Sequence, residues 1–196
     1  MKRAAFGIQV HSGWGVLVAV SGDPASVEVL ERKRIIIADP TILGAKQPYH
    51  SAMGLAPAES EKHIANCAAV SKRMAFTVIG EAARNWDERG YKIIGAAVLW
   101  ASGRPLPSLA KILAAHPLIH TAEGEFFRNA VREACEDLKI PVTAIREREL
   151  DDRAKTELRM SEQVQHRIAT LGKFLGPPWT KDHKTAALAA TVVLAG

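Results

Sequence analysis

The sequence contains few cysteines, which excludes a fold built on disulfides. Only two occur in 196 residues, Cys67 and Cys135, and both fall within helical patterns. A cysteine-based metal site would need closely spaced pairs, and this chain has none. The expected state is therefore two reduced thiols in the core of a cytoplasmic protein.

Long hydrophobic runs are also absent. The longest apolar stretches, residues 13–20 and 93–101, have the length of a strand, whereas a membrane-spanning helix needs roughly 18 or more apolar residues. The first residues contain neither the apolar stretch nor the cleavage site of a secretory signal. We therefore expect no membrane span and no membrane partner.

Motifs of the common nucleotide-binding and hydrolytic chemistries are missing as well. The chain has no phosphate-binding loop, no G-x-G-x-x-G, no G-x-S-x-G and no zinc-finger spacing. None of these motifs is therefore available to predict a reaction. The formal net charge of +5 and the pI near 9.4 are compatible with RNA or DNA as a partner. The basic residues, however, form short dispersed clusters instead of one stripe.

Hydrophobic periodicity predicts three strands at the N-terminus. Residues 5–11 alternate, with Phe6 on one face and Gln9 on the other. Turn signals separate this stretch from two further strands at 13–20 and 27–38. The three strands predict an antiparallel meander.

The remainder alternates between helices and strands. The almost continuously apolar residues 91–101 predict a strand that is buried on both faces of a partly parallel sheet. The expected order is a loop at 39–57, a helix at 58–88, this strand, a helix at 107–115, a connector at 116–120, a helix at 122–138, a strand at 140–145, broken helix at 148–175 and a last helix at 183–194. The pattern predicts one α/β domain over residues 1–196, with a mixed five-stranded sheet and a helical insertion at about 147–176.

The order of elements and two short motifs resemble the ribonuclease H-like superfamily. G-I-Q at residues 7–9, followed by H-S-G-W-G at 11–15, is similar to the opening G-I-D-P-G of RuvC-type Holliday junction resolvases. D-H-K-T-A-A-L-A-A at 182–190 resembles their last helix. The long helix from S-E-K-H-I at 60–64 to the strand after it more weakly resembles the central domain of peptide-chain release factors. The resemblance implies a three-layer α/β/α ribonuclease H-like fold.

The same resemblance implies a site for two divalent cations, held by carboxylates of the first strand, the fourth strand and the last helix. This chain departs from that set. The first-strand acid falls on Gln9, the strand at 91–101 has no acid, and the last helix offers Asp182 but has Thr185 where a second acid would stand. We therefore expect a catalytically degenerate member that binds nucleic acid, or a ribosomal or repair partner.

Two further groups of residues are candidates for chemistry. His11 shares a strand face with Gln9 and lies at the end of that strand. Ligands of open α/β sheets bind at strand ends, although a histidine at a turn can also bond to backbone. Asp182 would face the end of the first strand, although an N-cap role in the last helix also explains it. His120 and Glu123 belong to a polar stretch that could bind zinc or manganese or supply a general base, although Thr121 as an N-cap would explain the acids after it.

These residues define the alternative functions. A metal-assisted hydrolase or nuclease would use His11, His120, Glu123 and Asp182, with a divalent metal on His120, Glu123 and Asp182, and it requires these four side chains to converge. A protein-interaction module would instead use the loop at 39–57. A homodimer is compatible with either.

Candidate nucleic-acid contacts are two tryptophans and two arginines. Trp14 and Trp179 would stack on bases, although tryptophans more often pack in cores. Arg104 follows the fourth strand, where it would meet a phosphate, and Arg128 belongs to the polar stretch after His120.

Overall fold

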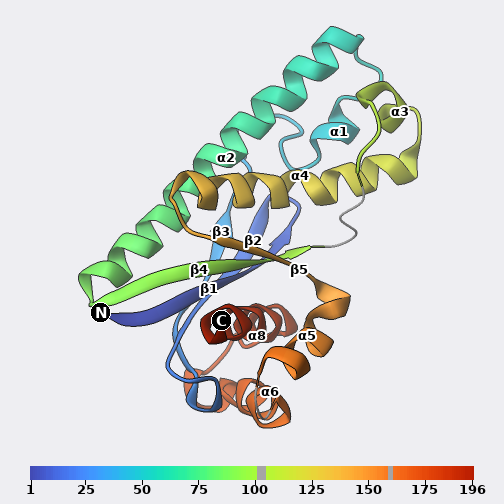
Figure 1. Cartoon of the computed structure of the whole chain (residues 1–196). Helices are drawn as coiled ribbons and strands as arrows, with labels where there is room; N and C mark the ends of the chain where they lie inside the picture. Colours follow the sequence, from blue (N-terminus) through green and yellow to red (C-terminus); the bar gives the residue numbers. More distant parts are fainter. Residues whose placement is uncertain (101–104, 159–160) are drawn as a thin grey trace.

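The computed structural model describes residues 1–100, 105–158 and 161–196, and its centre is a five-stranded sheet (Figure 1). The strand order is β3-β2-β1-β4-β5, with β1–β2–β3 antiparallel and β4 and β5 parallel to β1. This mixed sheet with flanking helices confirms the predicted ribonuclease H-like α/β fold. The strands are β1 (Lys2–His11), β2 (Trp14–Ser21), β3 (Glu28–Ile36), β4 (Tyr91–Trp100) and β5 (Val142–Arg146).

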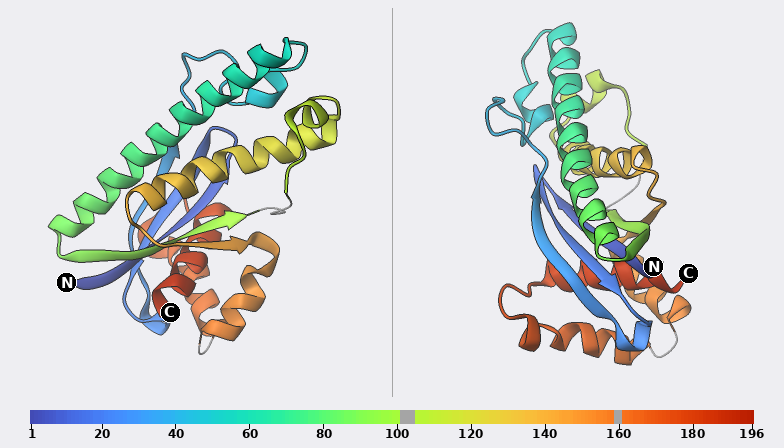
Figure 2. Two further views of the ribbon diagram at one scale, coloured as in Figure 1. Left: turned by 45° about the horizontal axis from the view of Figure 1, so that its top comes forward. Right: turned by 90° about the vertical axis from the view of Figure 1, so that its left-hand side faces the viewer.

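Helices cover both faces of the sheet (Figures 1 and 2). On one face lie α2 and α4, and on the other α8 lies with α5 and α6. The N-terminal part of α2 extends beyond the sheet, and α1 and the first turns of α4 lie beside this part of the helix. The helices are α1 (Pro48–Ser51), α2 (Pro57–Glu88), α3 (Leu109–Leu113), α4 (His116–Asp137), α5 (Leu150–Glu157), α6 (Ser161–Thr170), α7 (Gly172–Leu175) and α8 (Lys181–Ala195), with 3-10 turns η1 (Pro24–Ser26) and η2 (Glu147–Glu149).

The alternation of β1 divides its side chains between two cores. Phe6, Ile8 and Val10 pack with residues of α2 and α4, because successive side chains of a strand point to opposite faces. Gly7 faces α8, and a Cβ at this position would lie 1.8 Å from the carbonyl oxygen of Ala186. The missing side chain of Gly7 therefore lets α8 lie directly on β1.

Three local predictions near helix ends are wrong. Residues 116–120 are not a connector, because α4 begins at His116, with Pro117 in its first turn, where a proline is favoured. Thr121 is not its N-cap, since its hydroxyl donates to the carbonyl of Pro117 inside the helix. Asp182 is not an N-cap either, because Thr180 occupies that position of α8.

Three other observations bear on the sequence predictions. The loop at 39–57 contains the short helix α1. Within the described residues, none of the helices combines the length and apolar character that a bilayer crossing requires. Arg104 lies outside the described residues, so its predicted role stays a prediction.

Candidate functional site

The C-terminal end of β1 carries Gln9 at the position where the resemblance placed an acid. Gln9 is 6% exposed, and its Nε2 donates to Oε2 of Glu147 at 3.3 Å. Its Oε1 is buried and has no hydrogen-bond partner. The Gln9 amide brings no negative charge to this position, and its N–H group, not an oxygen, faces the carboxylate of Glu147, whereas a pair of divalent ions needs anionic oxygen ligands here.

His11 lies one step further along the same face of β1. Its Nε2 lies 2.9 Å from Oδ2 of Asp182, in the first turn of α8. The predicted proximity of Asp182 to the end of the first strand is therefore confirmed, and the histidine bonds to a side chain. We call Gln9, His11, Glu147 and Asp182 the strand-end site.

Two cationic side chains of the protein, Lys181 and Arg128, act on Glu147 of the strand-end site. Lys181 Nζ lies 3.2 Å from Oε1 of Glu147. Arg128 donates from Nε to the carbonyl of Leu99, near the end of β4, at 3.0 Å. Burial lowers the pKa of Arg128, against the opposing effect of the charges of Glu125 and Glu147. The protein's own cations thus balance the negative charge that metal ions would otherwise balance.

Trp14 begins β2 and lies beside His11 on the sheet. The two rings are stacked with centroids 4.3 Å apart, and the guanidinium carbon of exposed Arg34 lies 4.0 Å from the centroid of the Trp14 ring. The tryptophan predicted to stack on bases therefore stacks on protein groups here. Arg34 presents its positive charge to solvent at the edge of the strand-end site.

Trp179 is partly buried and packs against the core on the α8 side of the sheet. Its Nε1 donates to the carbonyl of Ile168 at 2.8 Å, and a Cβ on Gly172 would lie 2.7 Å from the nearest atom of its ring. These contacts join the chain before α8 to α6 and α7, which is a structural role for this tryptophan.

His120 and Glu123 lie on α4, on the other face of the sheet from α8 (Figure 1). Glu123 Oε1 accepts a hydrogen bond from the backbone N–H of His50 in α1 at 3.0 Å, and the rings of His50 and His120 are 4.9 Å apart between centroids. The four residues of the predicted hydrolase therefore form two groups, His11 with Asp182 and His120 with Glu123. They do not converge on one site.

Three residues of these groups escaped the sequence predictions. Glu147 was assigned only to the charged helical insertion, and its contact with Gln9 spans 138 positions of sequence. His50 lies in the segment that was predicted to be a loop. His116 is four residues before His120, a spacing that places both on one helix face. Because residues 116–120 were predicted to be a connector, this helical spacing was not recognised.

Comparison with known proteins supports the fold. No protein-family model and no curated protein matches this chain. Among solved structures, it is similar to Thermus thermophilus RuvC in complex with a Holliday junction substrate, with 12% identity over 97% of this chain and 91% of that chain and a TM-score of 0.54. A second Thermus thermophilus RuvC structure gives 14% identity, 96% and 91% coverage, and a TM-score of 0.52.

These findings define the class of the protein. The chain has the ribonuclease H-like fold. More particularly, its structure is similar to that of the RuvC resolvase along nearly the whole length of both chains. At this level of identity the likeness describes the fold, and the side chains of the strand-end site decide what chemistry is available.

Proposed function

We propose that this chain binds branched DNA at the strand-end site and does not cleave it by two-metal chemistry. The observation that carries the proposal is the bonding of Gln9. A buried amide replaces the first-strand acid and donates to Glu147. Two divalent ions would then lie among a neutral amide, a carboxylate paired with Lys181 and a carboxylate paired with His11, which leaves too little negative charge to screen them.

The nucleic-acid part of the proposal is supported by charge and by fold. The chain carries a net charge of +5, and a positive protein surface attracts the phosphate backbone. Arg34 is exposed over the ring of Trp14 at the edge of the strand-end site. One structural neighbour, RuvC, is in complex with a Holliday junction substrate, so a four-way junction is the first ligand to test.

Fluorescence anisotropy with a labelled four-way junction, a duplex of the same length and a single strand tests the binding. We expect the junction to bind most tightly at low salt and the affinity to fall as salt rises. Arg34→Ala should weaken binding and reduce the salt slope by about one, whereas Arg34→Lys should retain most of the slope. Lys62→Ala, which removes an exposed charge from α2, is the matched control.

The absence of two-metal cleavage is tested with the same labelled junction. We expect no product above background with Mg²⁺ or Mn²⁺ under conditions in which the junction is bound. Metal-dependent cleavage that Asp182→Asn abolishes would overturn this part of the proposal. Equal and weak affinity for all three DNAs, unaffected by Arg34→Ala, would overturn the binding part.

A further inference from the structure

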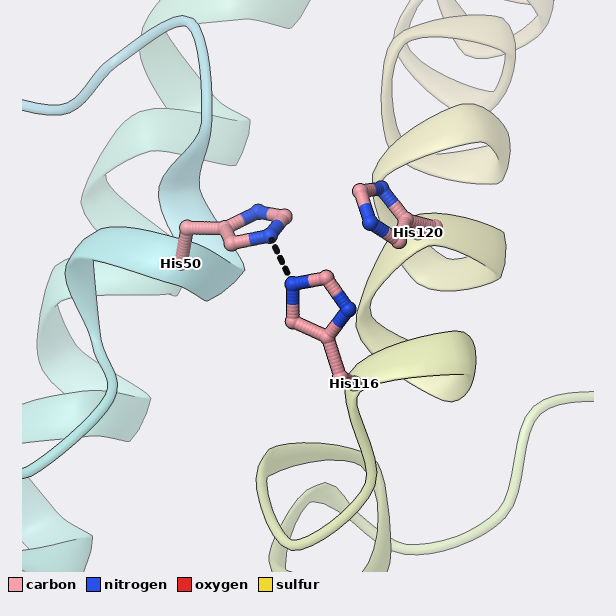
Figure 3. Close-up of side chains that lie close together, drawn as sticks. All are labelled: His50, His116 and His120. Carbon is pink, nitrogen blue, oxygen red and sulfur yellow. Dashed lines mark hydrogen bonds between the residues drawn. The ribbon is translucent and has the colours of Figure 1, made fainter.

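Three histidines meet where α1 lies against the first turns of α4. The rings of His50, His116 and His120 point toward one another (Figure 3), and one ring nitrogen of each lies within 4.8 Å of those of the other two. Across residues 1–100, 105–158 and 161–196, no other group of three or more His, Cys, Asp or Glu side chains is this close. We call these three residues the histidine cluster.

The backbone holds the histidine cluster in place without help from a ligand. His116 and His120 are one helical turn apart, so they share a face of α4. His50 reaches them from α1, which is fixed to α4 by the bond from the His50 backbone N–H to Glu123 and by the edge-on contact of Tyr49 with Phe126. A site that is formed before the ligand arrives loses less entropy on binding.

Glu123 places a buried negative charge behind His50. Its side chain is only 4% exposed, and its Oε1 lies 3.0 Å from Nδ1 of His50. This is ion-pair distance, although the buried Nδ1 makes no hydrogen bond. A buried carboxylate is costly unless hydrogen bonds or a positive group compensate it, so a cation bound beside His50 would stabilise Glu123.

We propose that His50, His116 and His120 bind one divalent transition-metal ion of the zinc type, with Glu123 orienting His50. Imidazole ligands favour zinc, cobalt, nickel or copper over magnesium or calcium. A carboxylate beside the second nitrogen of a ligating histidine is a frequent partner of such sites. Because His116 and His120 are exposed, a fourth position of the metal is open to water or to a small ligand.

The spacing of two ring nitrogens, which are joined by a hydrogen bond in Figure 3, is also compatible with a shared metal ion. Nε2 of His50 and Nε2 of His116 are 3.4 Å apart. Two nitrogens bound to one tetrahedral zinc, each at about 2.0–2.1 Å, are separated by roughly 3.3 Å. The metal charge would face the positive end of the α4 dipole, and the charge of Glu123 offsets that repulsion.

Isothermal titration of tag-free, EDTA-treated protein with ZnCl₂ tests the proposal, and CoCl₂ titration gives an optical readout. We expect saturable binding of one zinc per chain, the visible bands of four-coordinate Co²⁺, and no comparable binding of Mg²⁺. Glu123→Gln should lower zinc affinity by about 10–100-fold. His116→Gln and His120→Gln, each of which removes a ligand from an exposed position, should lower it further.

His166→Gln is the matched control. His166 is exposed on α6, far from the cluster in sequence and on the other side of the sheet. This variant should bind zinc like the unaltered chain, and circular dichroism of every variant should show unchanged helix content. Absence of saturable binding would overturn the proposal. An equal loss of affinity in His166→Gln and His120→Gln would overturn it too, because binding would then be distributed over surface histidines.

Discussion

The strand-end site and the histidine cluster differ in how their carboxylates are paired. In the strand-end site, two carboxylates are paired with His11 and Lys181, and the central position is a neutral amide. In the histidine cluster, three imidazoles face one another with a buried carboxylate behind one of them. In the first arrangement the carboxylates already have protein partners, whereas in the second a cation bound by the imidazoles would add positive charge beside the buried carboxylate.

This difference shows that a fold does not determine where a ligand binds. The place at which a ribonuclease H-like sheet would hold hard cations lies at the end of β1, and the residues there oppose such ions. A set of ligands suited to a softer ion is assembled instead beyond the sheet, by α1 and α4. The fold therefore does not determine the chemistry of its sites, which depends on the side chains that each site contains.

The largest expected effect on stability comes from adding a methyl group at Gly7, where α8 packs on β1, compared with the same change at Gly124 in α4. Gly7→Ala puts a Cβ 1.8 Å from the carbonyl oxygen of Ala186, so α8 must leave β1, and we expect a loss of about 3 kcal/mol or more in unfolding free energy. Gly124→Ala, in α4, meets only the end of the Arg128 side chain at 3.1 Å, and helix propensity favours it by about 1 kcal/mol at most. Urea denaturation measures both, and a cost below about 1 kcal/mol for Gly7→Ala would contradict the close packing of α8.

Zinc should stabilise the protein through the histidine cluster alone. At a free concentration of about 100 times its Kd, a ligand that binds only the folded state adds about 2.7 kcal/mol. We expect this gain in thermal or urea unfolding of the unaltered chain and of Asp182→Asn, and its loss in His120→Gln. A gain that depends on Asp182 would reverse the comparison, because the strand-end site would then be the metal site.

Replacement of Gln9 by aspartate tests the strand-end site directly. In Gln9→Asp the N–H group that donates to Glu147 is lost, and the new buried carboxylate faces the negative charge of Glu147. Gln9→Asp should therefore be less stable than Gln9→Asn by about 1–3 kcal/mol. The asparagine variant removes the same methylene and keeps the amide. Recovery of the lost stability in millimolar Mg²⁺, seen in Gln9→Asp but not in Gln9→Asn, would show that the strand-end site still accepts a cation.

The smallest expected effect is a pH dependence at the start of α8. Nδ1 of His183 accepts the backbone N–H of Thr180 at 3.2 Å, which caps the helix. Burial and the charge of Arg32 lower the pKa of His183, against the opposing effect of Asp182. The unfolded chain therefore binds a proton more readily than the folded one. The stability from this group is complete above the ordinary value near 6.5 and is lost as the pH falls through the folded pKa.

His183→Gln removes this titration while the glutamine side chain still caps Thr180. Urea denaturation at neutral pH and near pH 5 should show a smaller loss of stability for the variant than for the unaltered chain, by about the 1 kcal/mol of a helix cap. The difference should be independent of zinc, because His183 lies on α8 and not in the histidine cluster. Identical pH dependence in the two proteins would contradict the role of His183 as a neutral cap.

The succession of strands and helices could be predicted from hydrophobic pattern because burial is a property of each element. The alternating residues 5–11 lie in β1, and the apolar residues 91–100 form β4 beside it. Helix ends were less predictable. The start of α4 at His116 was missed, because proline and histidine before the apolar stripe suit both a connector and a first helical turn.

The candidate sites could be predicted only in part. Asp182 beside His11 followed from the resemblance to RuvC-type resolvases, which implies that groups of the first strand and the last helix meet. The bond from Gln9 to Glu147 did not follow, because it joins residues 138 positions apart and depends on where the chain turns after β5. The approach of His50 to His116 and His120 depends on the position of α1, a helix of four residues that has no pattern of its own.

By itself, the sequence determined the α/β class, the alternation of elements and the absence of an acid at position 9, because these follow from local composition and periodicity. Only the tertiary structure decided which charges neutralise one another and which histidines meet. Coulombic and coordination interactions act over a few ångströms, and that distance is set by how distant segments pack.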